Sequence, residues 1–451
     1  MSFPRYAKYK DSGVEWLGEV PGHWTISRLG FESWVRARLG WKGLKAEEYV
    51  DDGFAFLSTP NIKGTEIDFE NVNFIDQYRF DESPEIILRE GDVLLAKDGS
   101  TLGTVNVVRS LPRPTTVNSS IAVITPNRGL SGVFLYYLFE SSFMEHTIQR
   151  IKGGMGVPHL FQADLNKFYL PLPSQGEQAV IAEFLDREMV KIDALVAEQR
   201  RLIDLLKEKR RIGITQAVTK GVNPHATMKP SGIEWLGDVP KHWDVMPLKH
   251  LILPGTSISY GIVQPGDSLE DGIPFVQTTN MTTGDFALDS LQKTSPEIAD
   301  QYPRSMLCGG EVILGIRASI GAAHVVPQFL RGANLSRGVA RIVPNKQVLS
   351  NYLVKYFDTT AVSRYWQLSK QGSTFNEVSI ETVRELEIPV PPVAEQTEIT
   401  SSLKATLRQL DELTAEAQRA IDLLQERRTA LISAAVTGKI DVRGLVQTEA
   451  A

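Results

Sequence analysis

The strongest constraint on this chain of 451 residues is an internal duplication. The segment SGVEWLGEVPGHW at 12–24 recurs as SGIEWLGDVPKHW at 231–243, with ten of thirteen residues identical and an offset of 219. Self-similarity over so long a period indicates two copies of one structural unit. The chain is therefore expected to fold as two related modules.

The repeat continues beyond this segment but not evenly. GDVLL at 91–95 aligns with GEVIL at 310–314, and LPLP at 170–173 aligns with IPVP at 388–391 after one residue is lost near Thr101, which changes the offset to 218. The copies match poorly in three places: 30–90 against 249–309, 96–101 against 315–319, and 152–164 against 370–382. A shared frame with divergent insertions predicts one scaffold that presents two different surfaces. The alternative is drift without any change of function.

Each copy ends in a long helical pattern. Prolines close the globular part, since proline cannot continue a sheet ladder or a helix interior. The patterns then run from about Glu177 to Thr219 and from Glu395 to Thr437. Ser174 is a suitable N-cap with Glu177 three residues later, and the glycines of Lys220-Gly221 and Gly438-Lys439 are stop signals.

Apolar residues seven apart predict that these helices pair as a coiled coil. The first stripe contains Leu185, Ile192, Gln199 and Leu206, with Leu195 and Leu202 on the second seam position. The second contains Leu403, Leu410, Ala417, Leu424 and Leu431, with Leu413 and Ala420 beside them. An antiparallel pair is expected, with a module at either end of a rod of roughly 60 Å. Such a spacer suits duplex DNA, whose helical turn is about 34–36 Å.

Composition restricts the class of protein. The single cysteine, Cys308, excludes an internal disulfide framework and cysteine-rich zinc sites. No leader-like apolar region and no stretch of about 18 apolar residues occurs, so a cytoplasmic protein is expected. The net charge of −6 is unusual for an isolated nucleic-acid binder. Local basic residues or a partner subunit would have to supply the phosphate contacts.

The common catalytic motifs are absent from the sequence. No Asp-x-Lys or Glu-x-Lys occurs, the only Gly-Lys pair is followed by Ile440, and no His-Glu-x-x-His is found. Neither Asn-Pro-Pro-aromatic nor Asp-Pro-Pro-aromatic, the motifs of amino-methyltransferases that act on bases, is present. The seven histidines have no ligand spacing, and His23 and His242 are expected to pack or to cap a turn. We predict no catalytic residue and no metal site.

Together these motifs resemble the DNA-specificity subunit of type I restriction–modification systems. The resemblance rests on WLGEVPGHW and its second copy, the Gly-Asp-Val-Leu-Leu segment, the Pro-x-Pro…Glu-Gln start of each helix and the Ala-Val-Thr at its end. It implies one target recognition domain per half, each reading one part of a split site on double-stranded DNA, and two antiparallel spacer helices. It also implies a non-catalytic subunit of a restriction endonuclease and adenine-specific DNA methyltransferase complex.

The resemblance further implies partners and the location of cofactors. Two methyltransferase subunits would dock on the chain, and two motor–nuclease subunits could join them. The chain itself would hold no cofactor, because S-adenosylmethionine, ATP and Mg²⁺ would be bound by those partners.

The predicted fold is α/β (α+β), with two pseudo-repeated recognition domains and a coiled coil. The expected domains are target recognition domain 1 at 1–173, spacer helix 1 at 174–221, target recognition domain 2 at 222–391, spacer helix 2 at 392–440, and a tail at 441–451. Trp16, Trp24, Trp235 and Trp243 are expected to anchor the cores, since tryptophan buries a large area.

Candidate DNA contacts are polar and basic residues on glycine-rich loops. In the first domain these are Arg36, Arg38, Lys42, Lys97, Ser100, Thr101, Lys152, Gly153 and Gly154. In the second they are Ser259, Tyr260, Arg317, Ser319, Asn334, Arg337, Lys370, Gly372, Ser373 and Thr374. Each of them could instead lie in a solvated turn. Two other functions stay open from the residues alone: a coiled-coil adaptor that does not bind DNA, and a nuclease or methyltransferase in its own right.

Overall fold

The computed structural model describes residues 3–38, 44–152, 158–369 and 377–445, and the chain divides into two units. Unit 1 combines Met1–Gln199 with Arg419–Ala451, whereas unit 2 is Arg200–Gln418. Each unit holds one globular module and part of both long helices. The two units are described separately below.

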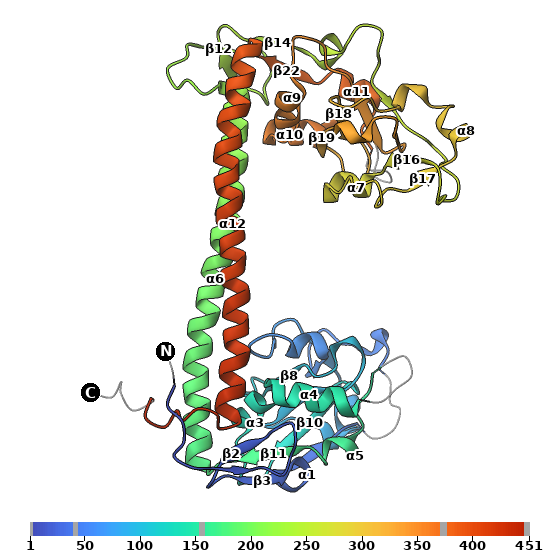
Figure 1. Ribbon diagram of the computed structural model, residues 1–451. Helices are drawn as coiled ribbons and strands as arrows, with labels where there is room; N and C mark the ends of the chain where they lie inside the picture. Colours follow the sequence, from blue (N-terminus) through green and yellow to red (C-terminus); the bar gives the residue numbers. More distant parts are fainter. Residues whose placement is uncertain (1–2, 39–43, 153–157, 370–376, 446–451) are drawn as a thin grey trace. The chain divides into compact units, whose positions relative to one another are not determined.

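The long helices are α6 (Gln175–Lys220) and α12 (Val393–Val436), and in both units they lie side by side (Figure 1). In unit 1, Arg428 Nη1 donates to Asp193 Oδ1 at 2.6 Å. In unit 2, Arg210 pairs with Asp411, and Gly221, which follows α6, lies against Glu395 near the start of α12. Residue numbers thus rise along α6 while they fall along α12. This confirms the predicted antiparallel pairing.

The seam between the helices differs in part from the prediction. Leu185, Ile192 and Leu206 are buried as expected, but Leu195 and Leu202 are 50% and 42% exposed and Leu413 is 40% exposed. The second seam position in α6 consists instead of Met189, Val196 and Ile203, all of them buried. It lies four residues after the first position rather than three, and the sequence offers apolar residues at both spacings.

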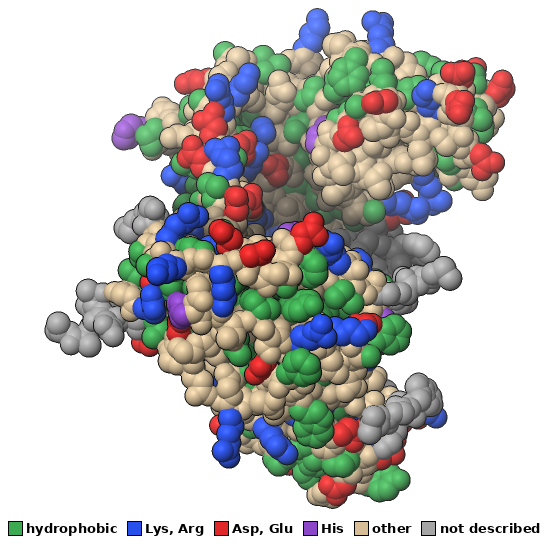
Figure 2. Space-filling view, turned by 60° about the horizontal axis from the view of Figure 1, so that its bottom comes forward, with side chains coloured by type: hydrophobic (Ala, Val, Ile, Leu, Met, Phe, Trp, Pro, Cys, Tyr) green, Lys and Arg blue, Asp and Glu red, His purple; other side chains and the backbone are tan. Residues whose placement is uncertain are grey.

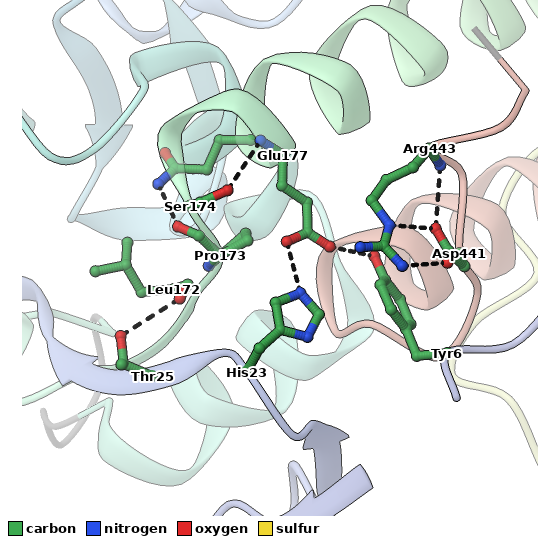
Figure 3. Close-up of polar contacts among 10 residues, drawn as sticks. Tyr6, His23, Thr25, Leu172, Pro173, Ser174, Glu177, Asp441 and Arg443 are labelled. Atoms are coloured by element: carbon green, nitrogen blue, oxygen red, sulfur yellow. Dashed lines mark hydrogen bonds and ion pairs between the residues drawn. The ribbon is translucent and has the colours of Figure 1, made fainter. Parts of the chain in front are cut away.

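The first turn of α6 is tied to the N-terminal segment of the chain. Ser174 Oγ accepts a hydrogen bond from the Glu177 amide at 3.3 Å, which confirms the N-cap (Figure 3). The Glu177 carboxylate accepts from the Tyr6 hydroxyl at 2.7 Å and lies 2.9 Å from His23 Nε2. Burial, and then the hydrogen bond to Glu177, raise the pKa of Tyr6, so this hydroxyl stays a donor. His23 therefore has a structural contact, as the sequence predicts.

The described residues of unit 1 form four small sheets. Their strands are, in spatial order, β1 (Tyr9–Asp11) and β2 (Glu19–Pro21); β3 (Thr25–Arg28) and β11 (Tyr169–Leu172); β4 (Ser33–Arg36), β10 (Ile121–Pro126), β7 (Val93–Ala96) and β8 (Val105–Val107); β6 (Asn73–Ile75), β5 (Phe54–Leu57) and β9 (Thr115–Val117). The shorter helices are α1 (Leu29–Glu32), α2 (Gln77–Asp81), α3 (Gly132–Phe139), α4 (Ser142–Ile151) and α5 (Gln162–Leu165). Of these, α3 packs on β7 and β8.

The part of unit 2 that the structure describes repeats these four sheets. Their strands are β12 (Met228–Pro230) and β13 (Asp238–Pro240); β14 (Asp244–Pro247) and β22 (Glu387–Val390); β15 (Ser259–Tyr260), β21 (Val339–Ile342), β18 (Val312–Gly315) and β19 (Ala323–Val325); β17 (Lys293–Thr294), β16 (Ile273–Val276) and β20 (Asn334–Leu335). The shorter helices are α7 (Thr278–Thr283), α8 (Pro296–Ala299), α9 (Ser350–Phe357), α10 (Thr360–Ser369) and α11 (Ile380–Arg384). Strand order is the same even where the sequences diverge.

The repeated tryptophans account for the shared core. Trp24 and Trp243 are fully buried, whereas Trp16 and Trp235 are only half-buried. Trp16 Nε1 donates to the Thr147 hydroxyl at 2.9 Å, which anchors it to α4. The prediction of core anchors therefore holds fully for the second tryptophan of each repeat and in part for the first.

The acid of the repeated Gly-Asp/Glu-Val segment is buried and paired in both units. In unit 1, Asp92 Oδ2 accepts from Arg36 Nη2 at 2.5 Å, and the two side chains are 0% and 2% exposed. In unit 2 the equivalent Glu311 lies 3.1 Å from Arg341 Nε, and its side chain is 3% exposed. A different strand supplies the arginine in each case, β4 in the first and β21 in the second. The shared acid thus needs a cation, but not one from a fixed position.

The segment after α12 packs on the start of unit 1. The Asp441 amide donates to the Pro4 carbonyl at 2.8 Å, and Lys439 Nζ donates to the Glu19 carbonyl at 2.8 Å. Arg443 lies over the Tyr6 ring, 4.9 Å from its centroid, and binds Asp441 (Figure 3). The hydrogen bond from Arg443 lowers the pKa of Asp441. Unit 1 is therefore completed by residues from both ends of the described chain.

Among the described residues, no helix has the length and apolar character needed to cross a membrane.

We expect Asp92→Ala to lower the free energy of unfolding by about 3–5 kcal/mol, because it leaves the Arg36 guanidinium buried without a counter-charge. Asp52→Ala is the control, since Asp52 is 85% exposed in its pair with Arg113 and a surface pair is worth about 0–1 kcal/mol. Denaturant unfolding measures both. Equal, small changes would contradict the assignment of Arg36 as a buried structural cation.

We expect Gly438→Ala to destabilise unit 1 by about 2 kcal/mol or more. Gly438 has φ +72°, and an added Cβ would lie 2.3 Å from Pro21 Cδ and 3.1 Å from Trp24 Cη2. Gly444→Ala is the matched control, because nothing lies within 4 Å of its added Cβ. Thermal unfolding together with limited proteolysis after α12 would test this. Equal behaviour of the two variants would show that the closing segment does not support unit 1.

Candidate nucleic-acid interface

Three strand ends meet at one edge of the four-stranded sheet of unit 2. β15 and β18 both pair antiparallel with β21, so their carboxyl ends lie beside the beginning of β21. The Ile316 amide donates to the Gly338 carbonyl at 2.9 Å and joins the turn after β18 to the residues before β21. Tyr260, Arg317 and Arg337, three of the predicted contacts, come together at this edge. Tyr260 is 48% exposed and Arg337 is exposed.

Unit 1 has the same edge, formed by β4, β7 and the beginning of β10. The Lys97 amide donates to the Ser120 carbonyl at 2.8 Å, the counterpart of the bond in unit 2. The predicted contacts Lys97, Ser100 and Thr101 follow β7 at this edge, and Arg38 follows β4. We call the two edges the reading edges of units 1 and 2.

The polar side chains at the reading edge of unit 1 differ in accessibility. Ser100 is exposed, and so is Lys152, a predicted contact that follows α4 rather than a strand of this edge. The Lys97 side chain is 14% exposed, and its Nζ lies 3.2 Å from Asp98 Oδ2. Arg38 is half-buried, with its guanidinium 5.8 Å from the centroid of the Phe56 ring. Ser100 and Lys152 are therefore more open to a ligand than Lys97 and Arg38.

Some predicted contacts are structural instead. Arg36 is 3% exposed and bound to Asp92, and Asn334 is 1% exposed and bonded to the Ser305 hydroxyl, so the prediction that they contact DNA is wrong. The sequence could not reveal this, because the partner that each buried polar side chain binds is distant in the chain. Ser319 is 8% exposed, and Ser259 donates its hydroxyl to the Arg304 carbonyl at 2.9 Å.

Seven predicted contacts lie outside the described residues: Lys42, Gly153, Gly154, Lys370, Gly372, Ser373 and Thr374.

Each reading edge contains a pair of side chains that the sequence analysis missed. In unit 1, Asp98 faces His159 across an isolated antiparallel bridge, and its carboxylate contacts His159 Nδ1. In unit 2, Arg317 faces Glu377 across the same kind of bridge, and its guanidinium contacts the Glu377 carboxylate. We call Asp98–His159 and Arg317–Glu377 the loop clamps. The repeat gives only a partial signal: offsets of 219 and 218 align both members between the units, but do not show which residues lie opposite each other.

The turn that follows β7 in unit 1 and β18 in unit 2 has the same backbone shape in both units. Gly99 has φ +74°, and the equivalent Ala318 has φ +50°, the only non-glycine positive φ among the described residues. An alanine held in the left-handed region is strained, and such strain persists only where its surroundings impose it. The shape of this turn is thus kept although its sequence has changed.

Unit 2 also contains a groove of about 1240 Å³ between α9 and α12. Lys355 and Lys404 are among the residues that line it, and burial lowers the pKa of Lys355. The equivalent positions of unit 1 are linked to each other, because the Tyr137 hydroxyl donates to Asp186 Oδ1 at 2.6 Å. In the described ranges, no group of three or more His, Cys, Asp or Glu residues is placed to hold a metal ion.

On the face drawn in Figure 2, the described lysines and arginines are interspersed with aspartates and glutamates. This fits the net charge of −6. On this face, attraction to a polyanion would depend on individual basic residues rather than on a broad basic surface.

Comparisons with known proteins agree with this architecture. The family model for the type I restriction modification DNA specificity domain matches residues 44–200 and 243–422. The chain is 27% identical over 290 residues to the type I restriction enzyme EcoBI specificity subunit of Escherichia coli, an alignment that covers 63% of this chain and 61% of that relative. It is 22% identical over 438 residues to the MjaVIII specificity subunit of Methanocaldococcus jannaschii, covering 94% and 95%.

Solved structures have the same fold. A chain from a type I restriction–modification system aligns with a TM-score of 0.70 at 19% identity, covering 92% of this chain and 98% of that one. The HsdS subunit from Thermoanaerobacter tengcongensis aligns with a TM-score of 0.52 at 19% identity, covering 93% and 98%. Since the family model matches two segments that together exceed half of the sequence, this chain belongs to the type I restriction modification DNA specificity domain family.

Proposed function

We propose that this chain is the DNA-specificity subunit of a type I restriction–modification complex and that each unit reads one part of a split target. The observation that carries the proposal is the pair of reading edges. Their backbone hydrogen bonds match, while their side chains differ. Equal frames with unequal side chains are what two different half-sites require, because base identity is read by side-chain donors and acceptors.

The residues proposed to contact DNA are those accessible at the reading edges. In unit 1 they are Ser100 and Thr101, with Lys97 and Arg38 nearby, and the exposed Lys152, which follows α4, is proposed as well. In unit 2 they are Tyr260 and Arg337, with Arg317 beside them. Double-stranded DNA is the proposed ligand, and further phosphate contacts would come from partner subunits, because the chain is acidic overall.

Exposed leucines on the long helices support the proposal that two methyltransferase subunits dock on the chain. In unit 1, Leu195 and Leu423 are 50% and 65% exposed, and in unit 2 the equivalent Leu413 and Leu205 are 40% and 53% exposed. Apolar side chains left outside a helical seam can be covered by another helix. Their presence at equivalent positions suits two copies of one partner.

In this proposal the chain itself is non-catalytic and works in the cytoplasm, where the DNA and the partner subunits are. Adenine methylation, with S-adenosylmethionine, would belong to the methyltransferase subunits. ATP and Mg²⁺ would be bound by motor–nuclease subunits, where the complex includes them.

Methylation mapping of host DNA tests the function. In cells that contain the chain and its methyltransferase, we expect methylation at one split sequence, and deletion of the chain should abolish it. Methylation that is unchanged by the deletion would refute DNA reading and favour an adaptor role. Methyl transfer or DNA cleavage by the isolated chain would show instead that it is itself an enzyme.

Arg337→Ala should weaken binding of the complex to its mapped sequence by about 1–3 kcal/mol. If Arg337 contacts a base, the loss should be confined to one half-site, whereas a phosphate contact should reduce the salt dependence by about one ion. Arg331→Ala is the matched control, since Arg331 is also exposed but precedes β20. Equal affinities for the two variants would exclude Arg337 from the interface.

A further inference from the structure

The loop clamps occupy the same backbone site in the two units. In unit 1, the Leu160 amide donates to the Lys97 carbonyl at 2.9 Å, and in unit 2 the Val378 amide donates to the Ile316 carbonyl at 2.9 Å. Both bonds join the turn after β7 or β18 to the segment that leads into the next short helix, α5 or α11. The backbone alone therefore brings the two chain segments together in each unit.

The acid and the basic side chain stand on opposite segments in the two units. The acid Asp98 lies in the turn of unit 1 and pairs with His159, whereas the cation Arg317 lies in the turn of unit 2 and pairs with Glu377. The four side chains are similarly accessible: 29% and 29% exposed in unit 1, 30% and 33% in unit 2. Although both residues of the site have changed, an acid still faces a basic side chain.

We propose that the loop clamps are positioning pairs for DNA recognition. What matters in each clamp is that an acidic side chain faces a basic one across the two segments, whichever segment carries the acid. Each clamp would hold the turn of its reading edge in one place before DNA arrives. In unit 2 this assigns Arg317 to the clamp rather than to a base contact. The inference rests on the proposed function and adds to it the residues that fix the geometry of each reading edge.

Accessibility favours positioning over stability as the role of the pairs. Acid–base side-chain pairs that retain this much contact with water add little to the free energy of folding. They can nevertheless restrict a turn whose remaining anchors are a few backbone hydrogen bonds. A turn that is free in the unbound protein loses conformational entropy when DNA orders it, and affinity falls accordingly.

Exchange of the clamps between units provides the test. Asp98→Arg and His159→Glu each break the clamp of unit 1. The double variant places a basic side chain in the turn and an acid opposite it, which is the arrangement of unit 2. Arg317→Asp with Glu377→His does the reverse in unit 2. Asp98→Asn removes the charge without adding repulsion. Asp52→Arg is the matched control, since it breaks another ion pair of unit 1, that with Arg113.

Two measurements are needed. Hydrogen exchange without DNA follows the amides of Gly99 and Leu160, which donate to the Pro158 and Lys97 carbonyls at 3.1 and 2.9 Å. Affinity is measured for the complex with its methyltransferase subunits, on duplexes that carry the mapped split sequence with either half intact. Single clamp variants should exchange faster and bind about tenfold more weakly through the affected half. The double variants should recover to within about threefold of wild type.

Several outcomes would overturn the inference. If the single variants show the same hydrogen exchange and DNA affinity as Asp52→Arg, the clamps do not restrain the turns. Faster exchange with unchanged affinity would limit them to local structure. Failure of Arg317→Asp with Glu377→His to restore binding, while its exchange recovers, would make Arg317 a direct DNA contact. A wild-type complex without sequence-specific binding would refute the proposed function itself, and this is seen before any variant is compared.

Discussion

The apolar seam between α6 and α12 is the interaction on which both units depend. Unit 1 is assembled from two separate stretches of chain, and the antiparallel pairing of the helices holds the second stretch beside the first. At the end of α12, Gly438 lies against Pro21 and Trp24, and at the end of α6, Gly221 lies against Trp243. Each helix thus finishes on the buried tryptophan of a module. The modules could not close as they do if the helices were parallel or differently registered.

The repeat and the helices could be predicted from the sequence because both depend on local sequence patterns. Ten identities in thirteen residues reveal two modules, and the positions of Ser174 and Gly221 mark the ends of α6 to within a residue or two. The second seam position could not be predicted. Leucines occur three residues after the first position, and Met189 and Val196 occur four residues after it. Only the packing of the partner helix chooses between them.

The candidate site was predictable in outline and not in detail. The offset of the repeat correctly pointed to the turns after β7 and β18 as equivalent and divergent, and the structure places both at a sheet edge. Arg36 and Asn334 have the chemistry of DNA contacts, but each is buried with a partner far along the chain. Side-chain type alone cannot separate an exposed arginine from one that neutralises a buried acid. The loop clamps were missed because the aligned repeat shows which positions are equivalent, but not that Asp98 lies opposite His159 or Arg317 opposite Glu377.

The composition of the units has a consequence for the order in which the protein can fold during synthesis. Domains made of continuous chain fold as they leave the ribosome, usually beginning with the N-terminal one. Here unit 2 is continuous, Arg200–Gln418, whereas unit 1 needs Arg419 and the residues beyond it. The α6 part of the seam in unit 1 therefore stays uncovered until the residues from Arg419 onward have been made. Translation that stops before Arg419 would leave unit 2 complete, whereas the apolar seam residues of α6 in unit 1 would stay exposed to water.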